Sequence, residues 1–416
     1  MRLLYFIFNF FLLISFGSQA QTEHEVAPPF NIKTAAFTQG GQSVVPIFRL
    51  GENFQFRFDD LFASEQDYMY TITHCDYNWQ PSPLSKMDYL NGFDNVRIQN
   101  YENSKNTLQG YSHYVLNFPN NQTRIKISGN YILKIFDSNT DLVLSRRFVI
   151  YETNVGVSLQ IKRSRTISEI EQRHNLDFTI RPGNLMLQNP NQNVKVVLLQ
   201  NGIWNTAITK IQPQYTISGD LIYKYDKDTS FYGSNEYMYL ETKDIRAGNN
   251  TVNRVTSGEI YNSYLYTNLA RGNQVYTYNP DINGNFVTSV ANRENPNVEA
   301  DYTWVYFSLQ APSYFGKDDI YISGMFNNYA LTDEYKMEYD SKDGIYKKAV
   351  LIKQGFTNYK YVLANKKKQV NQKDAIDGNF YQTENDYYVL VYYKGTTDRY
   401  DKVIGLGKAN SSNISN

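Results

Sequence analysis

The densest group of reactive side chains in this 416-residue sequence runs from His74 to Trp79. A cysteine next to a histidine and an acid is the residue set of a thiol nucleophile with a general base. The preceding residues, 68–73, are typical of a β-strand, and neighbours along a strand point to opposite faces. His74 and Cys75 therefore cannot easily share one site. We expect a structural cysteine, with the ring and the Asp76 carboxylate making turn contacts.

Two pairs of adjacent acids, Asp59-Asp60 and Asp318-Asp319, raise the possibility of glycosidase chemistry. That chemistry needs two carboxylates that face each other about 5–10 Å apart across a cleft. Adjacent acids at strand ends are more often turn residues, and we interpret both pairs in that way. Lys366-Lys367-Lys368 is interpreted as a solvated hairpin loop.

Other catalytic and binding motifs are missing from the sequence. It contains no Gly-x-Ser-x-Gly elbow, no His-Glu-x-x-His, no P-loop and no dinucleotide fingerprint. Residues 281–285 imitate the start of a calcium loop, but the glycine is at the fourth position and Asn292 replaces the acid at the twelfth. We therefore interpret Asn283-Gly284 as a hairpin turn. One cysteine and four histidines argue against a disulfide framework and a zinc site. The sequence thus predicts no enzyme, no cofactor and no metal, and it assigns no binding residues.

Composition indicates a sheet protein. The sequence has 41 Lys+Arg, 41 Asp+Glu and 15% aromatic residues, with 37 tyrosines. A net charge of zero gives no electrostatic reason to expect nucleic acid or anionic lipid as a partner. Aromatic side chains fit pleated, half-buried surfaces.

The first 20 residues have the features of a cleaved signal peptide. Arg2 is followed by an apolar run over 3–16, which is short of the roughly 20 residues that span a bilayer. Small residues up to Ala20 favour cleavage there. We therefore expect an exported chain, and since no cysteine lies near the cleavage site, only a protein partner could hold it at a membrane.

Strand patterns recur along the rest of the chain. Apolar runs or strict alternation of apolar and polar residues occur at 53–58, 131–136 and 142–151. Polar turns separate these segments, as in a β-sandwich. We expect an all-β chain of about three consecutive immunoglobulin-like β-sandwich domains. The predicted division is a signal peptide at 1–20, an N-terminal sandwich at 21–153, a middle sandwich at 154–292, a polar linker at 291–297, a C-terminal domain at 300–404 and a flexible tail at 405–416, which contains the P-loop-like fragment Gly405-Leu406-Gly407-Lys408.

Several motifs in fixed order carry a family resemblance. They are Thr73–Trp79, Tyr101–Ser104, Tyr111–Tyr114, Phe118–Asn120, Ser128–Leu133 and Arg147–Val149. Together they resemble the plug protein family of the bacterial type IX secretion system of Bacteroidetes, over nearly the whole mature chain and most strongly over 28–155. The resemblance implies a periplasmic protein that associates with the giant outer-membrane β-barrel translocon. It also implies that the protein occludes the periplasmic end of the pore when no cargo passes.

A second resemblance concerns the C-terminal part. Residues 320–329, 353–355 and 359–362 are similar to glycogen-binding-type immunoglobulin-like carbohydrate modules, which usually carry Trp where this chain has Tyr329. An alternative function is therefore an exported carbohydrate-binding protein. A third is secreted cargo of the same system, for which the C-terminal residues show no clear sorting domain.

Overall fold

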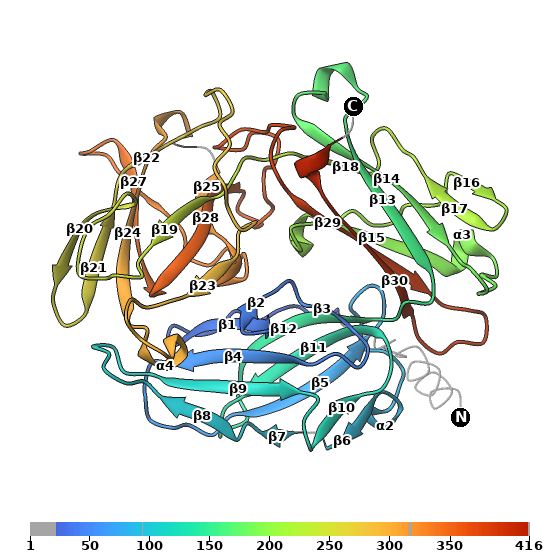
Figure 1. The fold of residues 1–416 in the computed structure, drawn as a ribbon, viewed down its shortest axis with the longest axis horizontal. Coiled ribbons are helices and arrows are strands. Elements are labelled where there is room, and N and C mark those ends of the chain that lie inside the picture. Colours follow the sequence, from blue (N-terminus) through green and yellow to red (C-terminus); the bar gives the residue numbers. More distant parts are fainter. Residues whose placement is uncertain (1–21, 94, 315, 317, 415–416) are drawn as a thin grey trace, which may run out of the picture.

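Strands form nearly all of the regular structure, as the composition predicts. The computed structural model describes residues 22–93, 95–314, 316 and 318–414, so the predicted signal peptide lies outside the described residues. Figure 1 shows three β-rich lobes around a common centre, with lobe 1 (residues 22–153) below lobe 2 (154–234 and 386–414) and lobe 3 (235–385). No helix among the described residues is long and apolar enough to cross a membrane.

Lobe 1 is a sandwich of two five-stranded sheets, in the orders β2-β1-β4-β9-β8 and β3-β12-β11-β5-β7. Its core is rich in phenylalanine because the inward positions of β4 are Phe54, Phe56 and Phe58. The elements are β1 (Ile32–Gln39), β2 (Gln42–Ser43), β3 (Ile47–Arg49), β4 (Phe54–Asp60), β5 (Met69–Cys75), α2 (Lys86–Tyr89), β6 (Leu90–Gly92), β7 (Val96–Arg97), β8 (Asn100–Asn103), β9 (Ser112–Phe118), β10 (Thr123–Ile125), β11 (Gly129–Phe136) and β12 (Leu142–Tyr151).

Lobe 2 packs the sheet β13-β14-β17-β16 against the sheet β15-β29-β30. Strand β29 reads Asp-Tyr-Tyr-Val-Leu-Val-Tyr-Tyr, an apolar run without alternation, which is typical of a strand buried on both faces. The elements are β13 (Gly156–Arg163), η1 (Ile167–Glu169), β14 (Arg173–Arg181), α3 (Pro190–Asn193), β15 (Val194–Gln200), η2 (Trp204–Thr206), β16 (Tyr215–Ile217), β17 (Asp220–Tyr223), β18 (Ser230–Tyr232), β29 (Asp386–Tyr393), β30 (Lys402–Asn410) and η5 (Ser411–Asn413).

Lobe 3 packs the sheet β20-β21-β24-β27-β26 against a layer centred on β28. Its central strand, β24, pairs with β21 on one side and with β27 on the other. The elements are β19 (Met238–Glu241), β20 (Val252–Ser257), β21 (Tyr261–Leu265), β22 (Asn268–Leu269), β23 (Phe286–Thr288), α4 (Pro296–Glu299), β24 (Tyr302–Gln310), η3 (Pro312–Tyr314), β25 (Asp319–Ser323), η4 (Met325–Asn327), β26 (Glu338–Asp340), β27 (Ile345–Lys353) and β28 (Gly355–Ala364).

The predicted division after the first sandwich is wrong. Strand β15, from the expected middle domain, pairs along its whole length with β29 from the expected C-terminal domain. Strand β19 likewise pairs with β28. Lobe 3 is therefore inserted between two parts of lobe 2. The expected linker at 291–297 lies within lobe 3 and runs into α4.

The expected tail is also largely a strand. Residues 405–410 complete β30, which pairs antiparallel with β29. Its glycines are explained by close packing, since a Cβ on Gly405 would lie 2.5 Å from Val155 Cγ2 and one on Gly407 would lie 2.6 Å from Val157 Cγ1. Gly405-Leu406-Gly407-Lys408 therefore fits against β13 and is no remnant of a phosphate loop.

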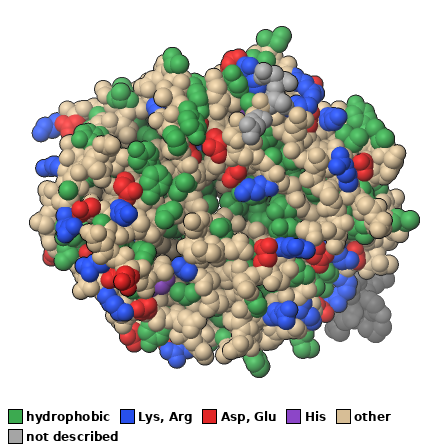
Figure 2. All heavy atoms as spheres, in the orientation of Figure 1, with side chains coloured by type: hydrophobic (Ala, Val, Ile, Leu, Met, Phe, Trp, Pro, Cys, Tyr) green, Lys and Arg blue, Asp and Glu red, His purple; other side chains and the backbone are tan. Residues whose placement is uncertain are grey.

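The lobes are joined by buried side chains. The outer face of β15-β29-β30 packs on lobe 1 through one cluster, which contains Cys75, Tyr77, Trp79, Ile132, Val149, Val197, Leu199, Tyr388, Leu390, Tyr392 and Val403. A smaller cluster joins lobe 1 to lobe 3 through Tyr111, Tyr302 and Leu351. On the surface, Lys and Arg are interspersed with Asp and Glu (Figure 2), in keeping with zero net charge.

Candidate functional site

The cysteine–histidine pair does not form a reactive site. His74 points into the lobe 1 core, where its ring contacts Tyr131 edge-on at 5.0 Å between centroids. Cys75 points the opposite way, into the cluster between lobes 1 and 2. Asp76 stabilises the turn by accepting hydrogen bonds from the backbone N–H groups of Asn78 and Gln80 at 2.8 and 2.9 Å. His74 and Cys75 thus lie on opposite faces, as the strand alternation predicts, and Asp76 lies in the turn that follows β5.

Burial also keeps both groups in their unreactive forms. It raises the pKa of the Cys75 thiol to about 12 and lowers the pKa of His74 to about 4. At neutral pH the cysteine is therefore a thiol and the histidine is a neutral ring. His74 Nε2 donates to the Ser128 carbonyl, and its Nδ1 accepts from the Ser82 hydroxyl at 2.8 Å.

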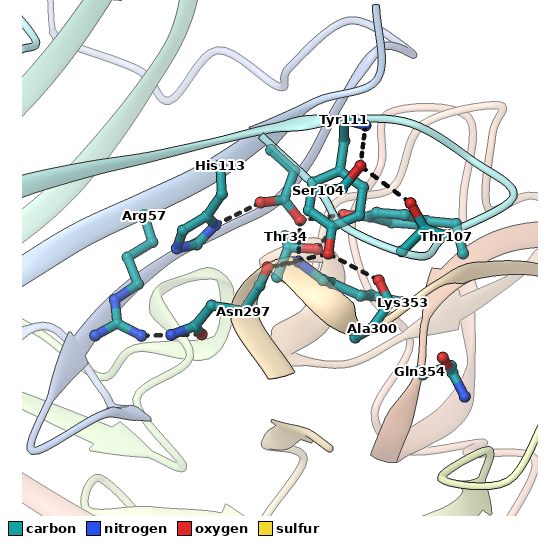
Figure 3. A network of polar contacts seen from close by, with 12 residues as sticks. Thr34, Arg57, Ser104, Thr107, Tyr111, His113, Asn297, Ala300, Lys353 and Gln354 are labelled. Atoms are coloured by element: carbon teal, nitrogen blue, oxygen red, sulfur yellow. Dashed lines mark hydrogen bonds and ion pairs between the residues drawn. The ribbon is translucent and has the colours of Figure 1, made fainter. Parts of the chain in front are cut away.

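A buried polar network instead surrounds Asp59, at the junction of lobes 1 and 3. Asp59 is the penultimate residue of β4 and is completely buried. Its Oδ1 accepts from Nδ1 of His113, on the neighbouring strand β9, at 2.6 Å. Its Oδ2 accepts from the Lys353 ammonium and from the Tyr302 hydroxyl, both at 2.6 Å and both from lobe 3. Figure 3 shows His113, Tyr111 and Lys353 converging on this junction. The carboxylate thus bridges two lobes.

The electrostatics of the junction favour an ionised Asp59. Burial alone would raise its pKa, but Lys353 and His113 outweigh burial and hold the pKa of Asp59 below its usual range. Lys353 is 7% exposed and also donates to the Asn297 carbonyl at 2.6 Å. Its ammonium lies 4.1 Å from the centre of the Tyr111 ring. The cation is therefore satisfied by a carboxylate, a carbonyl and an aromatic face, as a buried charge requires.

Further hydrogen bonds extend the junction along α4. The Tyr111 hydroxyl donates to the carbonyl of Ala300 at 2.8 Å. The Asp301 carboxylate accepts from the backbone N–H groups of Leu108 and Gln109 at 2.7 and 3.0 Å. The adjoining cavity, which Tyr302 and Lys353 help to line, has a volume of only about 50 Å³. This space is far below the roughly 300 Å³ of a small-molecule site. The network is therefore suited to holding two lobes together and not to turning over a substrate.

The interpretation of Asp59-Asp60 as turn residues is wrong for Asp59, which lies within β4 and bridges two lobes, whereas Asp60 ends β4 and accepts a hydrogen bond from the Phe62 backbone N–H in the following turn. Asp60 is also completely buried, and it accepts hydrogen bonds from the Tyr68 hydroxyl at 3.0 Å and Asn31 Nδ2 at 2.8 Å. Sequence reasoning missed the junction because the partners of Asp59 lie far along the chain. Alternation is misleading here, because Asp59 shares its face of β4 with the half-buried Gln55 and Arg57 and would be expected to reach solvent.

The other expected surface groups lie on the surface. Asp319 begins β25, is half-buried and forms an ion pair with Lys336 at 2.9 Å. Lys366–Lys368 is an exposed loop closed by the hydrogen bond from Asn365 N to the Gln369 carbonyl. Asn283-Gly284 is a turn, with φ values of 53° and 82°. Within the part of the chain that the structure describes, no three His, Cys, Asp or Glu side chains are grouped as metal ligands.

Tyr329 does not form a sugar-binding platform. The residue follows η4 and has a φ of 55°, a rare conformation for a bulky side chain. Its side chain lines a cavity between the lobes, together with Asn201 and Trp204 of lobe 2. Glycan binding needs an aromatic face open to solvent, and Tyr329 is turned inward. No observation supports the resemblance to carbohydrate modules.

The first lobe matches a known family. Residues 32–152 match the family described as the type 9 secretion system plug protein 1st domain. This match supports the resemblance to plug proteins over lobe 1, although the sequence motifs suggested a resemblance over nearly the whole chain. The matched residues span nearly all of the two-sheet sandwich of lobe 1.

Solved structures extend the comparison to the whole chain. A hypothetical protein from Parabacteroides merdae ATCC 43184 has a crystal structure that is 29% identical, with a TM-score of 0.89 over 94% of this chain and 100% of that one. The Parabacteroides protein therefore has the same three-lobed fold as this chain. Extracellular domains 3–5 of Drosophila OTK align over 93% of this chain and 98% of that one, at 10% identity and a TM-score of 0.15, a value too low to carry an argument. No curated protein sequence matches the chain.

Proposed function

We propose that this protein is the periplasmic plug subunit of a type IX secretion system. In this role it associates with the giant outer-membrane barrel and occludes the periplasmic end of its pore. The observation that carries the proposal is the match of residues 32–152 to the first domain of plug proteins. The predicted signal peptide supports export, and no other membrane attachment is required if the barrel is the partner.

The joined lobes support the proposal on physical grounds. A channel that passes folded proteins needs a stopper that is itself wide and keeps its shape. A compact chain of about 400 residues has a radius of gyration of about 21 Å, compared with about 13 Å for a 100-residue domain. Lobe 1 is fixed to lobe 3 by the buried Asp59–Lys353 pair and to lobe 2 by the Cys75 cluster. Three separate sandwiches on flexible linkers would each be narrower than the joined chain. They would therefore pass through the pore or leave gaps in it.

The hydrogen bonds between lobes 1 and 2 add to this rigidity. The Tyr392 hydroxyl donates to Asn130 Oδ1 at 2.7 Å, and the Tyr77 hydroxyl donates to the Val196 carbonyl at 3.1 Å. Both donors are buried side chains. Opening this contact would exchange these two bonds for bonds to water, at a net cost of about 0.5–1.5 kcal/mol each, and would expose the apolar cluster between the lobes.

The first test is a pull-down of the tagged, full-length protein from detergent-solubilised native outer membranes, followed by mass spectrometry. We expect a giant β-barrel protein in stoichiometric amount. A tagged periplasmic protein of similar size is the control for non-specific capture. Recovery of the chain as a free monomer in the periplasmic fraction, with no barrel in the membrane eluate, would contradict the proposal.

Occlusion is tested separately from association. We expect deletion of the protein to make cells sensitive to a large antibiotic that an intact outer membrane excludes, and reintroduction of the wild-type chain to restore resistance. Unchanged sensitivity after deletion, in cells whose barrel is still assembled, would show that the protein does not close the pore.

A further inference from the structure

A cavity of about 380 Å³ lies where the three lobes meet. Its wall comes from β1 and the segment around β2 in lobe 1, from residues 201–205 in lobe 2 and from residues 325–332 in lobe 3. A hollow near the middle of the molecule is seen in Figure 2. Its volume falls within the range of about 300–1,000 Å³ that is typical of small-molecule sites.

The wall contains a buried cation, Arg146. It lies on β12 between Leu144 and Phe148, on the side of the strand that faces the core, and is 5% exposed. Its Nη1 donates to the carbonyls of Ser145 and Val26 at 2.9 and 3.3 Å. Its Nε has no hydrogen-bond partner, and none of the ion pairs found among the described residues includes it.

The acids nearest to Arg146 are engaged elsewhere. Glu25 accepts from the backbone N–H of Arg147 at 2.8 Å and from Asn328 Nδ2 at 3.0 Å. Glu334 forms an ion pair with Lys33 at 2.5 Å. An arginine side chain stays protonated in proteins, and a buried charge is costly unless it is paired. Glu25 lines the same cavity and acts on Arg146 through its charge, but Arg146, Arg147 and Lys368 together leave the wall with an excess of positive charge.

The rest of the wall is mixed. Its apolar side chains include Phe37, Val44, Val45, Ile203, Trp204 and Leu331, and its charged ones include Arg147, Lys368 and Glu25. Three basic side chains against one acid, beside a broad apolar surface, match a molecule that carries one anionic group on a hydrocarbon body. A carboxylate is the anion whose two oxygens fit the fork of a guanidinium.

We propose that this central cavity binds a small organic carboxylate with an aliphatic or aromatic body. Arg146 pairs with the carboxylate group, and the body packs against Val45 and Trp204. Such a ligand would contact all three lobes at once and would stabilise their arrangement. The inference stands on the cavity alone and does not depend on pore occlusion.

Calorimetric titration of the mature protein with hexanoate tests the proposal. We expect saturable binding of one hexanoate per chain, a change in tryptophan emission because Trp204 lies in the wall, and no binding of hexanamide. Arg146→Met should weaken hexanoate binding at least tenfold. The exposed Arg181→Gln should leave binding unchanged and is the matched control.

A second variant covers the case in which Arg146→Met fails to fold. Ile203→Trp fills the cavity from a loop of lobe 2 and leaves Arg146 intact, and it should also abolish hexanoate binding. The proposal is overturned if wild-type protein gives no saturable heat with hexanoate, if hexanamide or inorganic phosphate binds equally well, or if both folded variants bind hexanoate as the wild type does.

Discussion

Replacing Asp59 by Asn should strongly destabilise the junction of lobes 1 and 3. The two side chains have the same shape, so the change creates no cavity, but it leaves the buried Lys353 ammonium without its counter-ion. Removing one partner of a buried ion pair typically costs about 3–5 kcal/mol. The 2.6 Å contacts of Asp59 with Lys353, Tyr302 and His113 place it at the upper part of this range.

Urea unfolding measures this effect, with tryptophan emission as the probe. Trp304 packs beside the junction cluster and reports on its opening. The double variant Asp59→Asn/Lys353→Met removes both charges and should be more stable than the sum of the single losses implies, by about 0.5–3 kcal/mol. Lys105→Met, at the solvent-exposed pair with Glu102, should leave the free energy of unfolding nearly unchanged and is the control. A loss below about 1 kcal/mol for Asp59→Asn, or additive effects in the double variant, would refute the assigned role of the pair.

Three further outcomes are expected. Cys75, buried with its thiol pKa raised to about 12, should not react with a thiol reagent in the native protein and should react fully in urea, so rapid native reaction would contradict its position. His174 has its pKa lowered to about 4 by burial, below the usual value of about 6.5, so it contributes stability above pH 6.5 that is lost as pH falls towards 4. The free energy of unfolding, measured with urea between pH 7 and 4, should therefore fall less steeply in His174→Gln than in the wild type. The difference in slope should be up to about 1.4 kcal/mol per pH unit. Gly405→Ala should destabilise lobe 2 by about 1–3 kcal/mol, because the new Cβ would overlap the Val155 side chain. An unchanged thermal midpoint would show that Val155 and the adjoining strand β13 move aside at little energetic cost.

Much of the local structure could be predicted from the sequence. The predicted strands at 131–136 and 142–151 correspond to most of β11 and to all of β12. The opposite orientations of His74 and Cys75 also followed from strand geometry. These features depend on neighbours along the chain, whose side-chain directions are fixed by the two-residue period of a strand.

The pairing of distant strands could not be predicted. The unbroken run of apolar and aromatic residues that follows Asp386 in β29 indicates burial on both faces, but it does not say which strands lie beside it. The pairing of β15 with β29, and hence the insertion of lobe 3 into lobe 2, is a long-range choice among many strands of similar character. For the same reason a polar pattern could not show that Asp59 would meet Lys353, which lies 294 residues away.

The sequence by itself thus determined the class of fold, the first sandwich and the motifs shared with plug proteins. These follow from local periodicity and from residue order, both of which are properties of short segments. The tertiary structure alone decided how the lobes are joined, that Asp59 bridges two of them, and that Arg146 faces a cavity between all three. Those features arise when apolar surfaces of separate segments are buried against one another, because burial then fixes which polar groups must find partners across the new contact.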